Sequence, residues 1–223
     1  TNPLYSPVEL GKSELKNRIV MAPLTRIRGE FDGTPNAMMK DYYAQRADFG
    51  MIITEGTWPI QEGRTWDRQP GIQTQAHIDA WREITDAVHD RDGKIIMQVM
   101  HGGRISHPEH TGPGRTVAPS AVAAPDQIRI SSGKVDPVVP QALTAEELPT
   151  IVAQFVTGSR NAMAAGIDGV QLHSANGYLL HEFLAPTTNL RTDHYGGTPE
   201  NRARFVIEVV RAVAEAIGAE NTG

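Results

Sequence analysis

The chain has 223 residues, of which 39% are hydrophobic and 21% charged, a composition typical of a globular domain with a sizeable core. Its formal net charge is -5 and its lysines and arginines form no cluster, so we expect neither nucleic acid nor an anionic membrane as a partner. The absence of cysteine excludes disulfides, cysteine-ligated metal centres and thiol nucleophiles. Without a signal-peptide pattern, or an apolar run near the ~18 residues of a membrane span, we expect a cytoplasmic protein that acts on a small molecule.

Four short apolar segments rich in β-branched residues predict buried parallel strands. Amphipathic patterns that predict helices lie between or after these segments, so the order is β-α repeated four times. Thr144 and Thr198 are expected to cap two of the helices, and Gly166 and Gly218 stand where helices should end. The predicted strands are "IVMA" from Ile19, "MIIT" from Met51, "IIMQV" from Ile95 and "GVQLH" from Gly169, and the predicted helices cover residues 36–48, 75–91, 145–165 and 199–217.

Two further segments predict hairpins. The opening "PVELGKSELKNRI" has two alternating stretches around polar residues, which suggests a hairpin that closes one end of the sheet or barrel. The stretch from Gly102 to Ala142 is rich in Gly, Pro and Ser and contains "QIRISSGKVDPV", which predicts a smaller hairpin. Long loops of this kind are usually functional.

A β-α series can form an open doubly wound sheet or a (β/α)8 barrel. The sequence favours the barrel, because the residues suited to chemistry follow directly after predicted strands, where a barrel places its site. These residues are Pro23-Leu24-Thr25, Glu55-Gly56-Thr57, Gln98 to His101 and His173 to Tyr178.

The segment "HSANGY" groups three polar side chains in one turn. Strand alternation places Gln171 and His173 on one face, and Asn176 follows in the turn. His173 and Asn176 could together hold a carbonyl oxygen that gains negative charge, and Tyr178 could serve as a general acid. Spacing alone equally allows a buried histidine, an ordinary Asn-Gly turn and a core tyrosine.

A second cluster lies in "IIMQVMHGGRISHPEH". Gln98 could recognise an amide-like edge of a cofactor, and Gly102-Gly103 permits a close approach of the backbone to a ligand. His101, His107 and His110 provide an alternative, a zinc-dependent hydrolase on a barrel scaffold, although their spacing matches no helical zinc motif. We therefore expect no metal site. Signatures of dinucleotide-binding, P-loop, serine hydrolase and zincin proteins are absent.

Five segments together resemble the Old Yellow Enzyme family of flavin-dependent ene-reductases, in chain order from Leu4 to Gly218. By composition alone the last of them predicts a solvated loop that leads into a helix. The resemblance implies the N-terminal portion of a (β/α)8 TIM barrel with a hairpin at the bottom and FMN across the carboxyl mouth. The segments are "NRIVMAPLTR", "YYAQRA", "QVMHGGR", "HSANGYLLHEFL" and "NLRTDHYGGTPENRARF".

The resemblance also implies roles for individual residues. Tyr178 matches the proton donor, and His173 and Asn176 match the pair that holds the substrate oxygen. Pro23, Leu24 and Thr25 match contacts beneath the flavin, Gly56 the small residue whose backbone meets it, and Gln98 the amide that bonds its pyrimidine edge. Trp66 falls where an aromatic covers the substrate pocket, and Met100 replaces a common aromatic, which should widen that pocket.

The implied reaction uses tightly bound, non-covalent FMN and NAD(P)H to reduce the C=C bond of an α,β-unsaturated carbonyl or nitro compound. We expect residues 1–223 to supply about the first four β-α units of a single FMN-binding barrel. In the family, later strands provide a basic residue near the flavin and the phosphate site. Either a complementary C-terminal polypeptide or the remainder of a longer chain is expected to complete the barrel; the alternative is an inactive fragment or assembly partner.

Overall fold

A four-stranded parallel sheet forms the centre of the protein, seen here in a computed structural model that describes residues 2–11, 13–112 and 114–223. The strand order β10-β5-β4-β3 follows the chain without reversal. A doubly wound sheet would reverse its order, so the predicted barrel arrangement is confirmed for this portion. The strands are β3 (Val20–Met21), β4 (Met51–Ile53), β5 (Ile95–Val99) and β10 (Gly169–Leu172).

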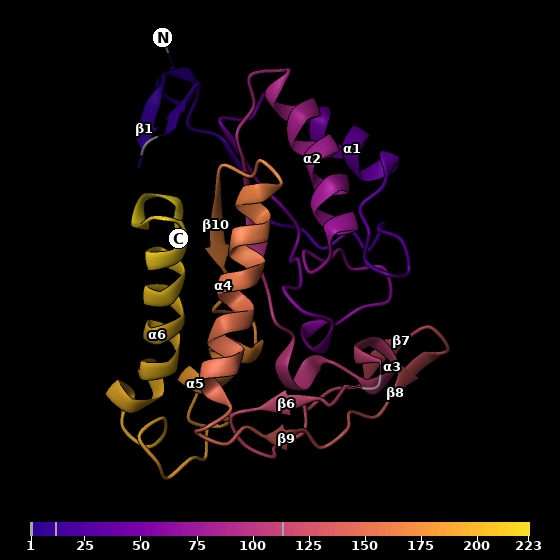
Figure 1. Ribbon diagram of the computed structural model, residues 1–223, viewed down its shortest axis with the longest axis vertical. Helices are drawn as coiled ribbons and strands as arrows, with labels where there is room; N and C mark the ends of the chain where they lie inside the picture. Colours follow the sequence, from indigo (N-terminus) through magenta and orange to yellow (C-terminus); the bar gives the residue numbers. More distant parts are fainter. Residues whose placement is uncertain (1, 12, 113) are drawn as a thin grey trace.

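Helices pack along the outer side of this sheet (Figure 1). α4 packs against β5, β10 and α6, whereas α1 pairs with α2. Trp81 of α2 and Phe155 of α4 are fully buried in the core between helices and sheet. No helix of the described residues is long and apolar enough to cross a membrane. The four long helices are α1 (Ala37–Ala44), α2 (Gln75–His89), α4 (Leu148–Ala164) and α6 (Pro199–Ile217).

The start of α2 and both ends of α6 lie where they were predicted, whereas the helix predicted over 36–48 already ends at Ala44. The Thr198 hydroxyl accepts the N–H of Asn201 at 3.3 Å, and Gly218 follows α6 with a φ of 95°. The predicted start of the third helix at Ala145 is wrong. The Thr144 N–H instead donates to the carboxylate of Glu147 at 2.7 Å, which forms a turn, and α4 begins only at Leu148.

The two ends of the sheet are built differently (Figure 1). At the amino end, the predicted hairpin of β1 (Val8–Leu10) and β2 (Ser13–Leu15) lies over the starts of the strands and encloses with them an apolar cavity of about 320 Å³. The second predicted hairpin, β7 (Ile128–Ile130) with β8 (Gly133–Val135), lies at the carboxyl end. The remaining short elements are β6 (Val117–Ala118), β9 (Gln141–Ala142), α3 (Pro108–Thr111), α5 (Leu179–Leu184), and 3-10 helices η1 (Pro3–Tyr5), η2 (Gln61–Gly63), η3 (Gly103–Ile105) and η4 (Ala219–Asn221).

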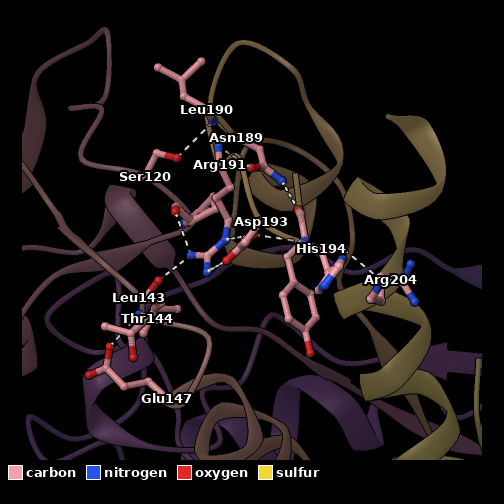
Figure 2. A network of polar contacts seen from close by, with 12 residues as sticks. Ser120, Leu143, Thr144, Glu147, Asn189, Leu190, Arg191, Asp193, His194 and Arg204 are labelled. Carbon is pink, nitrogen blue, oxygen red and sulfur yellow. Dashed lines mark hydrogen bonds and ion pairs between the residues drawn. The ribbon is translucent and has the colours of Figure 1, made fainter. Parts of the chain in front are cut away.

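Arginines fix the segment after α5 in place, as Figure 2 shows. The guanidinium of Arg191 pairs with Asp193, donates to the carbonyl of Pro119 at 3.1 Å and also donates to that of Leu143. Arg204 of α6 donates to the His194 carbonyl at 2.9 Å. Most residues from 190 to 200 are exposed, as expected of a solvated loop that leads into a helix, but the side chain of Arg191 is only 8% exposed and anchors the loop. The segment joins α5 and α6 to the β6–β9 region.

Candidate functional site

A cavity of about 360 Å³ opens at the carboxyl end of the sheet. It is lined by residues that follow β3 and β10, by Gln98 within β5 and Met100 just after it, and by Trp66 from the loop after β4. Nine of the ten residues predicted for the site meet there, from segments separated by up to 155 positions in sequence. They are Pro23, Leu24, Thr25, Trp66, Gln98, Met100, His173, Asn176 and Tyr178.

The segment after β3 forms one wall. β3 ends at Met21, and the chain then runs without regular structure through Pro23, whose nitrogen has no proton to contribute to a strand ladder. Leu24 is 54% exposed although it is apolar. Pro23 and Leu24 therefore present an open apolar platform, and Thr25 adds a hydroxyl beside it.

Two glutamines face each other across the middle of the sheet. Gln98 of β5 and Gln171 of β10 are paired in register, and Gln98 Nε2 donates to Gln171 Oε1 at 2.8 Å. Thr54 supports Gln98 from the other side, since its hydroxyl accepts the Gln98 backbone N–H at 3.1 Å. Gln171 was not predicted as a site residue, although its alternation with His173 placed it on the correct face. Gln98 lines the cavity, whereas Gln171 lies behind it and lines the cavity at the amino end.

Gly56, the tenth predicted residue, lies directly behind this wall. A Cβ atom at Gly56 would come within 2.8 Å of Met100 Sδ and 3.5 Å of Gln98 Oε1. Met100 itself is held by its backbone N–H, which donates to the Thr57 carbonyl at 2.9 Å. Its side chain is buried and packs over the glycine. Gly56 is thus a close-packing position beneath the cavity.

The turn after β10 carries the polar cluster. The His173 N–H donates to the Val99 carbonyl at 3.0 Å, which extends the pairing with β5 by one residue. Asn176 and Gly177 then adopt left-handed conformations, with φ values of 59° and 84°. Asparagine and glycine tolerate this region best, so the Asn-Gly pair suits the turn. α5 begins immediately after Tyr178.

The imidazole of His173 has one hydrogen-bonding nitrogen already engaged. Its Nδ1 accepts the N–H of Ala175 at 3.4 Å, so the proton of the neutral ring resides on Nε2. Burial lowers the pKa of His173, and the nearby His181 lowers it further. His173 is therefore neutral at pH 7 and has an Nε2–H available to donate to a ligand.

Tyr178 stands between two other rings. Its ring centroid lies 4.9 Å from that of His173 and 6.1 Å from that of Trp66, with both pairs tilted edge to face. Burial raises the pKa of the Tyr178 hydroxyl above its ordinary value of 10. The hydroxyl consequently carries its proton at neutral pH and can donate it.

The three histidines of the zinc alternative do not converge. His101 is fully buried beside Phe155, and its Nδ1 accepts the Gly103 N–H at 3.2 Å. His107 caps α3 by accepting the Glu109 N–H, whereas His110 lies 3.1 Å from Asp67. Among the residues that the structure describes, no group of three His, Asp or Glu side chains could hold a metal ion.

Comparison with known proteins gives consistent matches. The profile of the NADH:flavin oxidoreductase / NADH oxidase family matches residues 3–223. A probable flavin mononucleotide-dependent alkene reductase of Leishmania infantum is 46% identical over 99% of this chain and 62% of its own length. The chanoclavine-I aldehyde reductase of Penicillium roqueforti is 42% identical over 99% of this chain and 58% of its own.

Solved structures agree with this comparison. An old yellow enzyme homologue from Zymomonas mobilis superimposes with a TM-score of 0.96 at 45% identity, over 98% of this chain and 61% of that one. Morphinone reductase in complex with tetrahydroNAD superimposes with a TM-score of 0.94 at 42% identity, over 100% of this chain and 63% of that one. The chain thus spans about three fifths of the length of these relatives.

Proposed function

The chain belongs to the NADH:flavin oxidoreductase / NADH oxidase family, among the Old Yellow Enzymes, and from this premise we propose that the protein containing it is an FMN-dependent ene-reductase. The proposed reaction uses NAD(P)H to reduce the C=C bond of an α,β-unsaturated carbonyl or nitro compound. One observation carries the proposal: His173, Asn176 and Tyr178 line a single cavity together with Thr25 and Gln98.

The cavity suits a flavin ring, which is apolar on its faces and polar along its pyrimidine edge. The exposed platform of Pro23 and Leu24 offers an apolar face against which such a ring can lie. Gln98 and Gln171 together offer amide donors and acceptors, which match an edge of alternating carbonyl and N–H groups. Thr25 would contact the ring near its redox-active edge. We therefore propose for the ten predicted residues the roles that the resemblance implied.

When bound, FMN supplies the redox chemistry, because it accepts a hydride from NAD(P)H and passes it to the β-carbon of the alkene. The chain's own residues bind the substrate and move the proton. His173, through Nε2–H, and Asn176, through its side-chain amide, donate to the substrate oxygen and stabilise the charge that develops on it. Tyr178 then gives its hydroxyl proton to the α-carbon, which completes the reduction.

We propose this activity for the barrel in its complete form. Residues 1–223 would be the N-terminal part of a single FMN-binding barrel, and the remaining strands would come from the same chain or a complementary one. Two features support this: the chain spans about three fifths of its relatives, and residues Thr222 and Gly223 pair with β10 as the start of a further parallel strand would. A role as an assembly partner without activity is the alternative.

Anaerobic half-reactions test the proposal. NAD(P)H should bleach the visible absorption of the purified protein, and a cyclic enone or nitroalkene added afterwards should restore it with one equivalent of saturated product. Reduction by NAD(P)H that no activated alkene reverses would contradict the ene-reductase assignment. A protein that binds no flavin would favour the assembly role instead.

A further inference from the structure

A buried carboxylate, Glu55, lies beside the proposed site and has no part in the chemistry described above. It lies two residues after the end of β4, precedes Gly56, and is only 1% exposed. A buried carboxylate is costly unless its oxygens accept hydrogen bonds, so its partners indicate what it stabilises.

The partners of Glu55 belong mainly to the loop after β3. Its Oε2 accepts the backbone N–H groups of Arg26 at 2.9 Å and Ile27 at 3.2 Å. The hydroxyl of Tyr43 accepts the backbone N–H of Glu55 at 3.0 Å and donates to Oε1 at 3.4 Å. Two consecutive N–H groups directed at one oxygen are the arrangement by which backbone turns bind anions.

The loop that Glu55 holds is strained. Ile27 has a φ of 47°, in the left-handed region that a β-branched residue rarely adopts. Such a conformation is strained and persists only where surrounding contacts enforce it. Thr25 immediately precedes Arg26 and Ile27, whose N–H groups bond to Glu55, and it lines the cavity. The strained turn therefore determines where Thr25 lies.

We propose that Glu55 is a positioning residue: its carboxylate fixes the Arg26-Ile27 turn and thereby holds the Thr25 hydroxyl against the flavin. This inference rests on the proposed function. Glu55 acts through Thr25, so removing the Glu55 carboxylate should change the flavin reduction potential only to the extent that it displaces Thr25.

A double-mutant cycle on the flavin reduction potential tests this coupling. Glu55→Ala should shift the potential in the same direction as Thr25→Ala, and the double variant should show no shift beyond that of Thr25→Ala alone. Glu55→Gln keeps an oxygen that can accept both N–H groups, so it should retain the wild-type potential more closely than Glu55→Ala. Should Glu55→Ala not fold, Glu55→Asp, which withdraws the carboxylate by one methylene, takes its place in the cycle.

Two controls separate positioning from general disturbance. Val88→Ala removes buried volume in α2 and should lower the melting temperature without a change in potential. Glu182→Gln replaces another buried carboxyl group, and any effect it has should add to that of Thr25→Ala.

The outcomes distinguish this inference from the proposed function. Additive shifts for Glu55 and Thr25, or equal shifts for Glu55→Gln and Glu55→Ala, would show that the charge acts directly and would overturn the positioning role alone. A wild-type holoprotein that binds no flavin would overturn the proposed function and this inference with it.

Discussion

The rings of His173 and Tyr178 lie edge to face, with centroids 4.9 Å apart and planes inclined by 64°. One six-residue turn thus presents a neutral imidazole donor and a protonated phenol to the same cavity. Each group serves a different part of the proposed reaction, one the substrate oxygen and the other the α-carbon. Substitutions within the turn should therefore separate the two functions.

Tyr178→Phe should slow alkene reduction by about 10²–10⁴-fold, the usual contribution of a general acid, and leave flavin reduction by NAD(P)H nearly unchanged. Rapid-mixing measurements of the two half-reactions check this expectation. Tyr5→Phe, at an exposed tyrosine far from the cavity, is the matched control. Equal slowing of both half-reactions would remove Tyr178 from the role of proton donor.

Asn176→Gly should separate the amide from the backbone conformation. Glycine accepts the φ of 59° without strain, so the fold should be retained while the amide donor is lost. Loss of one hydrogen bond to a charged oxygen, worth about 1.5–3 kcal/mol, should weaken binding of a phenolate roughly 10–100-fold. Titration of the flavin absorption with the ligand measures this change. Unchanged affinity would show that Asn176 serves the turn alone.

Met100→Trp should narrow the cavity. Met100 packs over Gly56 and lines the pocket, so a larger ring there should exclude bulky alkenes while a small cyclic enone still binds. The comparison is kcat/KM for a small and a ring-substituted enone, in wild type and variant. Met100→Leu, which keeps the volume nearly constant, should leave the ratio of the two values unchanged. An unaltered ratio in Met100→Trp would place the selectivity elsewhere.

His101 should make the fold sensitive to acid. Burial lowers the pKa of His101 from 6.5 to about 3, so between those pH values the unfolded chain binds a proton that the folded chain excludes. The free energy of unfolding therefore decreases as the pH is lowered through this range, by up to ~1.4 kcal/mol per pH unit for one such group.

In His101→Leu this contribution is absent. The destabilisation of the variant relative to wild type should therefore be greatest at pH 7 and shrink as the pH falls toward 4. Urea unfolding of both proteins at several pH values measures it, with His194→Leu at an exposed position as the control for loss of an imidazole. A destabilisation that does not vary with pH would contradict this account.

Much of the fold could be predicted because local signals agreed with one another. β5 covers Ile95–Val99 as the run "IIMQV" predicted, and α6 begins and ends at its Thr198 and Gly218 signals. α5 was missed because it follows the Asn-Gly turn directly and no side chain caps its first turn. The start of α4 was misplaced because Glu147 bonds back to Thr144 and forms a separate turn.

The residues of the site likewise fall into those that the sequence predicted and those that it did not. Most of its cavity-lining residues were predicted because they lie in or just after a strand and belong to a segment that resembles the family, whereas Trp66 was predicted from the resemblance alone. The supporting residues could not be identified from sequence, because their roles depend on neighbours brought by folding. Gln171 meets Gln98 only through the register of β10 with β5, and Glu55 reaches the Arg26 N–H from another strand.

The most direct test of the central claim is a visible absorption spectrum of the purified native protein, combined with intact-mass analysis of every polypeptide in it. Flavin bands in a sample whose chain or chains supply the remaining strands are the predicted result. A colourless sample with the complete barrel present would contradict the claim that this cavity holds FMN.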